Sequence, residues 1–103
     1  MNNINDRIEK ILTENKTVLF MKGTPDFPQC GFSQRAVAIL GELQVPFFSV
    51  NILEDEELRS GMKEYGIKFR TFPQLYHNKE LVGGSGIMMD MFEDGQLKEE
   101  LAK

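Results

Sequence analysis

The single cysteine of the chain, Cys30, is the residue whose type and position best suit chemistry. It follows a loop that contains Pro25 and Pro28, and it precedes a stretch, residues 31–43, with apolar residues at helical spacing. At a helix N-terminus the free N–H groups and the helix dipole stabilise an anion, so they favour the thiolate over the thiol. A buried, inert cysteine is the commoner state of a free thiol, but the position at a loop–helix junction favours a reactive one.

The cysteine and histidine counts limit the chemistry that one chain can do. One cysteine excludes an internal disulfide, a mechanism that needs two thiols in one chain, and a metal site built only from this chain's cysteines. The only histidine, His77, stands beside Asn78 and Lys79 in a predicted turn, so we expect a solvent-exposed ring rather than a zinc ligand. Cys30 is then a buried apolar residue, a lone nucleophile, or one ligand in a site that other molecules complete. Ser33, three residues after Cys30, is expected to be an ordinary residue of the first helical turn.

Length and composition indicate one small domain over residues 1–103, because apolar residues make up 41% and charged residues 27% of the chain. The 16 acidic and 12 basic residues leave a net charge of −4, which argues against nucleic acid and against an anionic membrane surface as partners. No run approaches the ~18 apolar residues of a membrane span, and the first residues are polar, unlike a secretory signal. We therefore expect a cytoplasmic protein, in a compartment that keeps Cys30 reduced.

The remaining residues predict short elements in close succession. The predicted helices span about 3–14, 31–43, 55–65, 87–92 and 96–101, and the predicted strands span 17–21, 47–52, 72–76 and 77–82. The first two strands are joined through a helix and should be parallel, whereas the last two form a hairpin about Asn78 and Lys79. This order predicts an α/β fold with a four-stranded mixed sheet flanked by helices. Ser85 is the expected cap of the fourth helix, in which Met88 and its neighbouring methionines should fill the core rather than bind a soft metal.

Four motifs, taken in order, match one known family. They are Met21-Lys22-Gly23-Thr24-Pro25, Cys30-Gly31-Phe32-Ser33, Thr71-Phe72-Pro73-Gln74-Leu75-Tyr76 and Gly83-Gly84. In this order they resemble the monothiol glutaredoxins, and the match extends over essentially the whole chain. A lone Cys-Gly-Phe-Ser would be weak evidence, but the ordered set is highly specific. The resemblance implies a thioredoxin-like fold, which agrees with the predicted element order.

The resemblance also implies a glutathione-binding site. Lys22 and Arg59 would bind the glycine carboxylate of glutathione, although from spacing alone Arg59 would be a solvated helix charge. The other implied contacts are Thr71, Phe72, Pro73, Ser85 and Gly86. Phe72 and Pro73 would form a cis-proline corner, where the backbone of Phe72 pairs with the cysteinyl part by strand addition and Thr71 lines the same groove. Residues 85–86 would bind the γ-glutamyl carboxylate at a helix start. The plainer alternatives are a core phenylalanine and a simple helix cap.

The chain departs from the family pattern in two places. Gly86 stands where the family commonly has an aspartate that would contact the glutathione ammonium, so Gly86 is expected to contribute backbone only. Residues 66–70 replace a stretch that usually contains Trp-Pro and are one residue longer. In them Phe69 would supply the aromatic packing, and Lys68 or Arg70 would add charge near the groove.

The function that the resemblance implies is to carry a [2Fe–2S] cluster and pass it to recipient apoproteins. A cluster needs four ligands, usually thiolates, and Cys30 supplies one. Two chains and two glutathione molecules would supply all four, so we expect a cluster-bridged homodimer or a complex with a BolA-like protein. The alternative is a glutathione-dependent thiol–disulfide oxidoreductase with Cys30 as its nucleophile, an activity that the resemblance implies to be weak. A thioredoxin-fold interaction module with an inert cysteine is the third interpretation.

Overall fold

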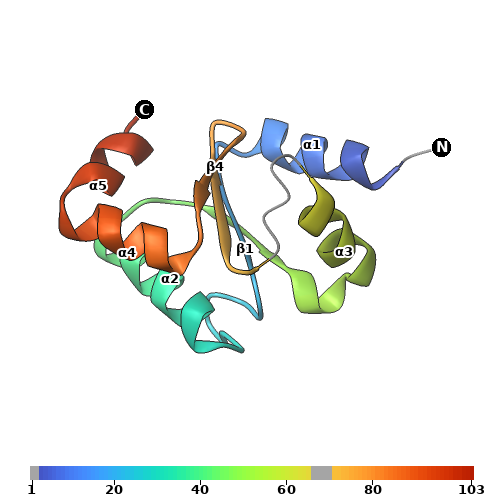
Figure 1. The fold of residues 1–103 in the computed structure, drawn as a ribbon, viewed down its shortest axis with the longest axis horizontal. Helices are drawn as coiled ribbons and strands as arrows, with labels where there is room; N and C mark the ends of the chain where they lie inside the picture. The colour runs from blue at the N-terminus through green and yellow to red at the C-terminus, as the bar shows by residue number, and fades with distance from the viewer. Residues whose placement is uncertain (1–2, 66–70) are drawn as a thin grey trace.

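A four-stranded mixed sheet with helices on both faces organises the computed structural model of the chain, which describes residues 3–65 and 71–103 (Figure 1). The elements in order are α1 (Ile4–Glu14), β1 (Thr17–Met21), α2 (Gly31–Glu42), β2 (Phe48–Asn51), the 3-10 helix η1 (Ile52–Glu54), α3 (Glu56–Glu64), β3 (Gln74–His77), β4 (Glu80–Gly83), α4 (Ser85–Glu93) and α5 (Gln96–Leu101). The predicted elements are all found. Residues 66–70, with Lys68, Phe69 and Arg70, lie outside the described part of the chain.

The strand order is β2-β1-β3-β4, with β1 parallel to β2 and antiparallel to β3, and with β3 antiparallel to β4. The predicted mixed sheet is therefore confirmed. The second strand ends at Asn51 rather than at Ile52, because the side chain of Asn51 caps the 3-10 turn that follows. The carboxyl ends of β1 and β2 meet at one edge of the sheet, where Met21 is paired with Asn51.

The core lies in two layers, one on each face of the sheet. All five residues of β1 are buried, and alternate side chains point to opposite faces. Val18 and Phe20 belong to the cluster that α1 and α3 cover, whereas Leu19 and Met21 belong to the cluster that α2, α4 and α5 cover. In Figure 1 these two groups of helices lie on the right and on the left of the sheet. Each such side chain contributes about 1.5–3 kcal/mol when it is fully buried. Met88 is also fully buried, so its predicted place in the core is confirmed.

The hairpin between β3 and β4 turns at Asn78 and Lys79, as predicted, and both residues have positive φ angles, 51° and 70°. The prediction of an exposed His77 is wrong, since the residue is only 4% exposed. His77 ends β3, which lies inside the sheet between β1 and β4, and its Nδ1 is hydrogen-bonded to Oγ1 of Thr17 at 2.9 Å. Burial is the main cause that lowers the pKa of His77, and the nearby charge of Lys16 adds to it.

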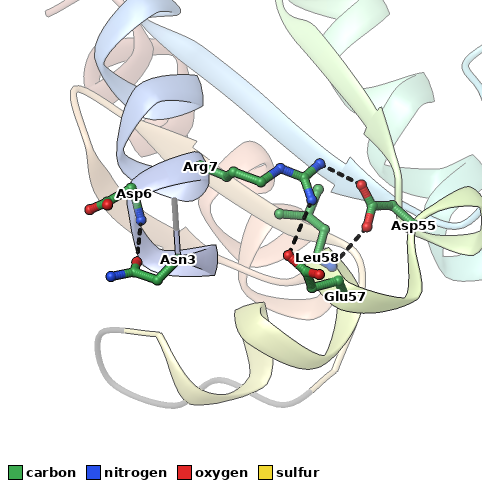
Figure 2. Close-up of polar contacts among 6 residues, drawn as sticks. All are labelled: Asn3, Asp6, Arg7, Asp55, Glu57 and Leu58. Carbon is green, nitrogen blue, oxygen red and sulfur yellow. Dashed lines mark hydrogen bonds and ion pairs between the residues drawn. The ribbon is translucent and has the colours of Figure 1, made fainter. Parts of the chain in front are cut away.

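Polar contacts hold α1 against the start of α3 (Figure 2). Arg7 reaches from α1 to Oδ2 of Asp55 at 2.5 Å and to Oε1 of Glu57 at 3.7 Å. Oδ1 of Asp55 accepts the N–H of Leu58 at 3.0 Å and so caps α3. Asn3 caps α1 in the same way, since its side-chain oxygen accepts the N–H of Asp6 at 2.9 Å. Within residues 3–65 and 71–103 there is no helix long and apolar enough to cross a bilayer.

Candidate functional site

Cys30 is the N-cap residue of α2, with extended backbone angles φ −156° and ψ 145°, and it is partly exposed. The loop that leads to it leaves β1 at the sheet edge where β1 and β2 end. Two backbone contacts close this loop. The N–H of Gln29 donates to the carbonyl of Lys22 at 2.9 Å, and Gly23 forms a bridge with Pro28. The loop therefore places the thiol beside the end of β1, at the start of a 12-residue helix.

The surroundings of Cys30 favour its ionised form. Burial is the largest single influence and works against the thiolate, but it is outweighed. The N–H groups of Ser33 and Phe32, the hydroxyl of Ser33 and the charge of Lys22 together hold the pKa of Cys30 below its usual value. No cap hydrogen bond is made to the thiol itself. The sequence-based expectation of a helix N-terminus that stabilises a thiolate agrees with this pattern.

Ser33 was expected to be an ordinary helix residue, and this prediction is wrong. The residue is fully buried, and its Oγ accepts the backbone N–H of Lys22 at 3.0 Å. Its hydroxyl and its own N–H also act on Cys30. The signal in the sequence was the three-residue spacing, which brings residue 33 under residue 30 in the first turn of the helix.

A cavity of about 380 Å³ lies between the N-terminal ends of α2 and α4 and brings most of the predicted ligand contacts together. Its lining includes Phe32, Thr71, Phe72, Pro73, Ser85 and Gly86. The Phe72–Pro73 peptide bond is cis, as the resemblance implied. A larger cavity of about 510 Å³ lies at the opposite end of β1 and contains none of the predicted site residues.

The start of α4 forms one wall of this cavity. Gly84, not Ser85, is the N-cap residue, and the predicted cap is therefore one residue off. Ser85 is instead the first residue of the helix and is buried. A Cβ atom added to Gly86 would meet nothing within 4 Å, so a side chain there would point into open space. The backbone N–H groups at the start of α4 therefore line the cavity, and Gly86 contributes no side chain to it.

Cys30 and the two predicted cations are not among the residues that line the cavity. Lys22 directly follows β1, and its charge acts on Cys30. Arg59 is on α3, where Nη1 lies 3.8 Å from Oε2 of Glu56. Within the part of the chain that the structure describes, Nε of Arg59 is buried and has no hydrogen-bond partner. An anionic ligand could supply the missing acceptor, because guanidinium groups bind carboxylates well.

The described residues contain no group of three or more histidine, cysteine, aspartate or glutamate side chains that could hold a metal ion. Cys30 therefore belongs to no such group within residues 3–65 and 71–103. A metal centre at Cys30 would take its other ligands from other molecules, as the cysteine count suggested.

Comparison with known proteins identifies the architecture and the motifs. The family model described as Glutaredoxin matches residues 17–82, which is more than half of the chain.

The chain belongs to the glutaredoxin family.

Its similar relatives place it among the monothiol members. The chain is 53% identical over 100 residues to Monothiol glutaredoxin-S14, chloroplastic, of Arabidopsis thaliana, covering 97% of this chain and 57% of that protein. It is 50% identical over 96 residues to Monothiol glutaredoxin-S7, chloroplastic, of Oryza sativa subsp. japonica, covering 93% and 56%. The chain thus spans a little over half the length of these two curated relatives.

A solved structure confirms the fold. The solution structure of reduced poplar apo GrxS14 is 52% identical in sequence, matches with a TM-score of 0.83, and covers 96% of this chain and 90% of that one. The thioredoxin-like fold and the resemblance to monothiol glutaredoxins are therefore both confirmed.

Proposed function

We propose that the chain binds glutathione in the cavity between the N-terminal ends of α2 and α4, close to the helix start that Cys30 caps. The proposed contacts are Lys22, Arg59, Thr71, Phe72, Pro73, Ser85 and Gly86. Three observations support a fit to this tripeptide, which has two carboxylates. The buried Nε of Arg59 has no acceptor in the described part of the chain, the cation Lys22 lies near the thiol, and the N-terminal end of α4 lines the cavity. An extended ligand could also pair with the backbone at residues 71–73.

We further propose that the bound glutathione and Cys30 together hold a [2Fe–2S] cluster as cargo for apoproteins in iron–sulfur cluster assembly. The observation that carries this proposal is a partly exposed cysteine whose pKa is lowered and which belongs to no group of three or more ligating side chains in the described part of its own chain. One thiolate is one quarter of the four ligands that a cluster needs. Two chains and two glutathione molecules complete the set, which makes the functional unit a cluster-bridged homodimer.

The proposed partners follow from the shared site. A BolA-like protein could replace one chain and supply different ligands, and recipient apoproteins would take the cluster. Phe32, 59% exposed, and Ile87, 47% exposed, line the cavity next to Cys30 and offer an apolar contact surface for such partners. The cytoplasm, as a reducing compartment, and a single domain over residues 1–103 remain part of the proposal.

The test is anaerobic reconstitution with iron and sulfide, with and without glutathione. The proposal expects visible cluster absorbance and a dimer in gel filtration only when glutathione is present, and the loss of both in Cys30→Ser. Ser60→Ala, a change of an exposed serine on α3, is the matched control and should keep the cluster. A chain that forms no cluster under these conditions but removes glutathione rapidly from mixed disulfides would overturn the carrier function.

The second candidate is a glutathione-dependent oxidoreductase, and the lowered pKa of Cys30 favours it. The Cys30 thiolate would attack the glutathione sulfur of a protein–glutathione disulfide and release the protein thiolate. A free glutathione thiolate would then attack the Cys30-bound glutathione sulfur, so that glutathione disulfide leaves and Cys30 is regenerated. Rapid turnover of a glutathionylated peptide, lost in Cys30→Ser, would support this activity. The absence of turnover would leave the carrier function alone.

A further inference from the structure

The side chain of Asn51 joins the two segments that carry Lys22 and Arg59. Its Oδ1 accepts two backbone hydrogen bonds, one from Gly23 and one from Leu53, each at 3.0 Å. Gly23 directly follows Lys22 at the end of β1. Leu53 belongs to η1, which leads into the helix of Arg59. One amide oxygen therefore links the loop that leads to Cys30 with the 3-10 turn that precedes α3.

The register of the sheet explains why residue 51 can make this link. Asn51 is the last residue of β2 and is paired with Met21, the last residue of β1. The two strands are parallel, so both chains leave the sheet at the same edge and then diverge. A short amide side chain at that point reaches both departing backbones. Asn51 is half-buried, so an unpaired N–H there would cost more than it does in open water.

The backbone conformation at Gly23 is tightly restricted. Its φ is +94°, and an added Cβ would lie 2.5 Å from the carbonyl oxygen of Phe27. On the other side of the link, Arg59 donates its backbone N–H to the carbonyl of Asp55 at 2.9 Å, and Asp55 caps α3. Leu53 is thus connected to Arg59 through the 3-10 turn η1 and through the capped first turn of α3. At one end of the link Gly23 is adjacent to Lys22, and at the other end Leu53 precedes the helix that carries Arg59.

We propose that Asn51 is a positioning residue that sets the spacing of Lys22 and Arg59 for the carboxylate of a bound glutathione. The inference rests on the proposed glutathione site. It adds a residue that touches neither the ligand nor the thiol. The charge of Lys22 also acts on Cys30, so loss of the link changes the reactivity of the thiol toward every disulfide alike. Recognition of the carboxylate is the part of the effect that only glutathione reports.

Substitution by serine isolates the link. A serine hydroxyl can still accept the N–H two residues further on, so Asn51→Ser keeps the turn at Leu53. It is too short to reach Gly23, and the bond between the two segments is lost. Asn51→Ala removes both bonds. Asn15→Ser is the matched control, since Asn15 lies at the opposite end of β1 and donates to the carbonyl of Ile11 at 3.0 Å.

The readout is the equilibrium constant for mixed-disulfide formation at Cys30. Each variant is equilibrated with glutathione disulfide. In this reaction one glutathione becomes bonded to Cys30 and the other leaves as the thiolate. A second equilibration uses 2-hydroxyethyl disulfide, which has no carboxylate. Asn51→Ser should lower the glutathione constant about fivefold relative to the hydroxyethyl constant. Asn15→Ser should change neither.

A double-mutant cycle completes the test. In a chain with both Lys22→Met and Arg59→Met, Asn51→Ser should have no further effect on the glutathione constant. Equal losses with both disulfides, or an undiminished effect in the double background, would overturn the positioning role. If the wild-type chain itself shows no preference for glutathione over the hydroxyethyl compound, the proposed glutathione site is wrong. A wild-type preference that Asn51→Ser leaves intact refutes only the role of Asn51.

Discussion

Oγ of Ser33 accepts the backbone N–H of Lys22 at 3.0 Å, and this bond ties the end of β1 to the first turn of α2. The same hydroxyl favours the thiolate of Cys30, on which the charge of Lys22 also acts. One buried serine therefore connects the thiol, the cation and the helix start. This relationship supports the view that the first turn of α2 is arranged around a reactive sulfur.

Replacing Ser33 by alanine should raise the pKa of Cys30, because the hydroxyl that favours the thiolate is removed. The pH at which the alkylation rate with iodoacetamide reaches half its maximum should move upward. The partly buried N–H of Lys22 also loses its acceptor, which should cost about 1 kcal/mol of unfolding free energy. Ser60→Ala, at an exposed position, should leave both measurements unchanged. An unchanged alkylation profile in Ser33→Ala would show that the hydroxyl has no influence on the thiol.

The sequence could predict the parts of the fold that depend on local pattern. The apolar run of β1, the turn at Asn78 and Lys79, and the burial of Met88 all follow from residue types over a few positions. The links made by Ser33 and Asn51 could not be predicted in this way. They depend on which backbone groups two distant elements bring within hydrogen-bond distance, and this is set by the packing of the whole sheet.

His77 shows the same limit and gives a prediction of its own. Its neighbours in the sequence are polar, but the sheet places it inside, with a lowered pKa. The unfolded chain therefore takes up a proton as pH falls through about 6.5, while the folded chain resists it. The contribution of neutral His77 to the free energy of unfolding should be complete above this pH and should decrease as the pH falls below it. The free energy of unfolding should change by at most about 1.4 kcal/mol per pH unit.

Chemical denaturation between pH 7.5 and pH 5, a range of about two and a half units around the ordinary histidine pKa, measures this effect. Since His77 is the only histidine, no second imidazole complicates the curve. His77→Val, which suits a strand, should make the unfolding free energy nearly independent of pH in that range. The same decline in wild type and in His77→Val would assign the effect to other groups.

Gly86→Asp should strengthen glutathione binding under the proposed function. The new side chain meets open space, and a carboxylate in the first turn of α4 suits the helix dipole. An exposed ion pair with the ligand ammonium is expected to raise the mixed-disulfide constant about two- to fivefold. Gly41→Asp, where an added Cβ also meets nothing, is the control and should have no effect. No gain in Gly86→Asp would place the ligand ammonium away from α4.

The central claim is that one chain holds one quarter of a shared cluster site, with Cys30 as its only protein ligand. Native mass spectrometry of the anaerobically reconstituted protein tests it most directly, because it counts chains, iron, sulfide and glutathione in one particle. We predict a species with two chains, two iron ions, two sulfides and two glutathiones, absent from Cys30→Ser. A cluster on a single chain, a cluster without glutathione, or a cluster that persists in Cys30→Ser would contradict the account.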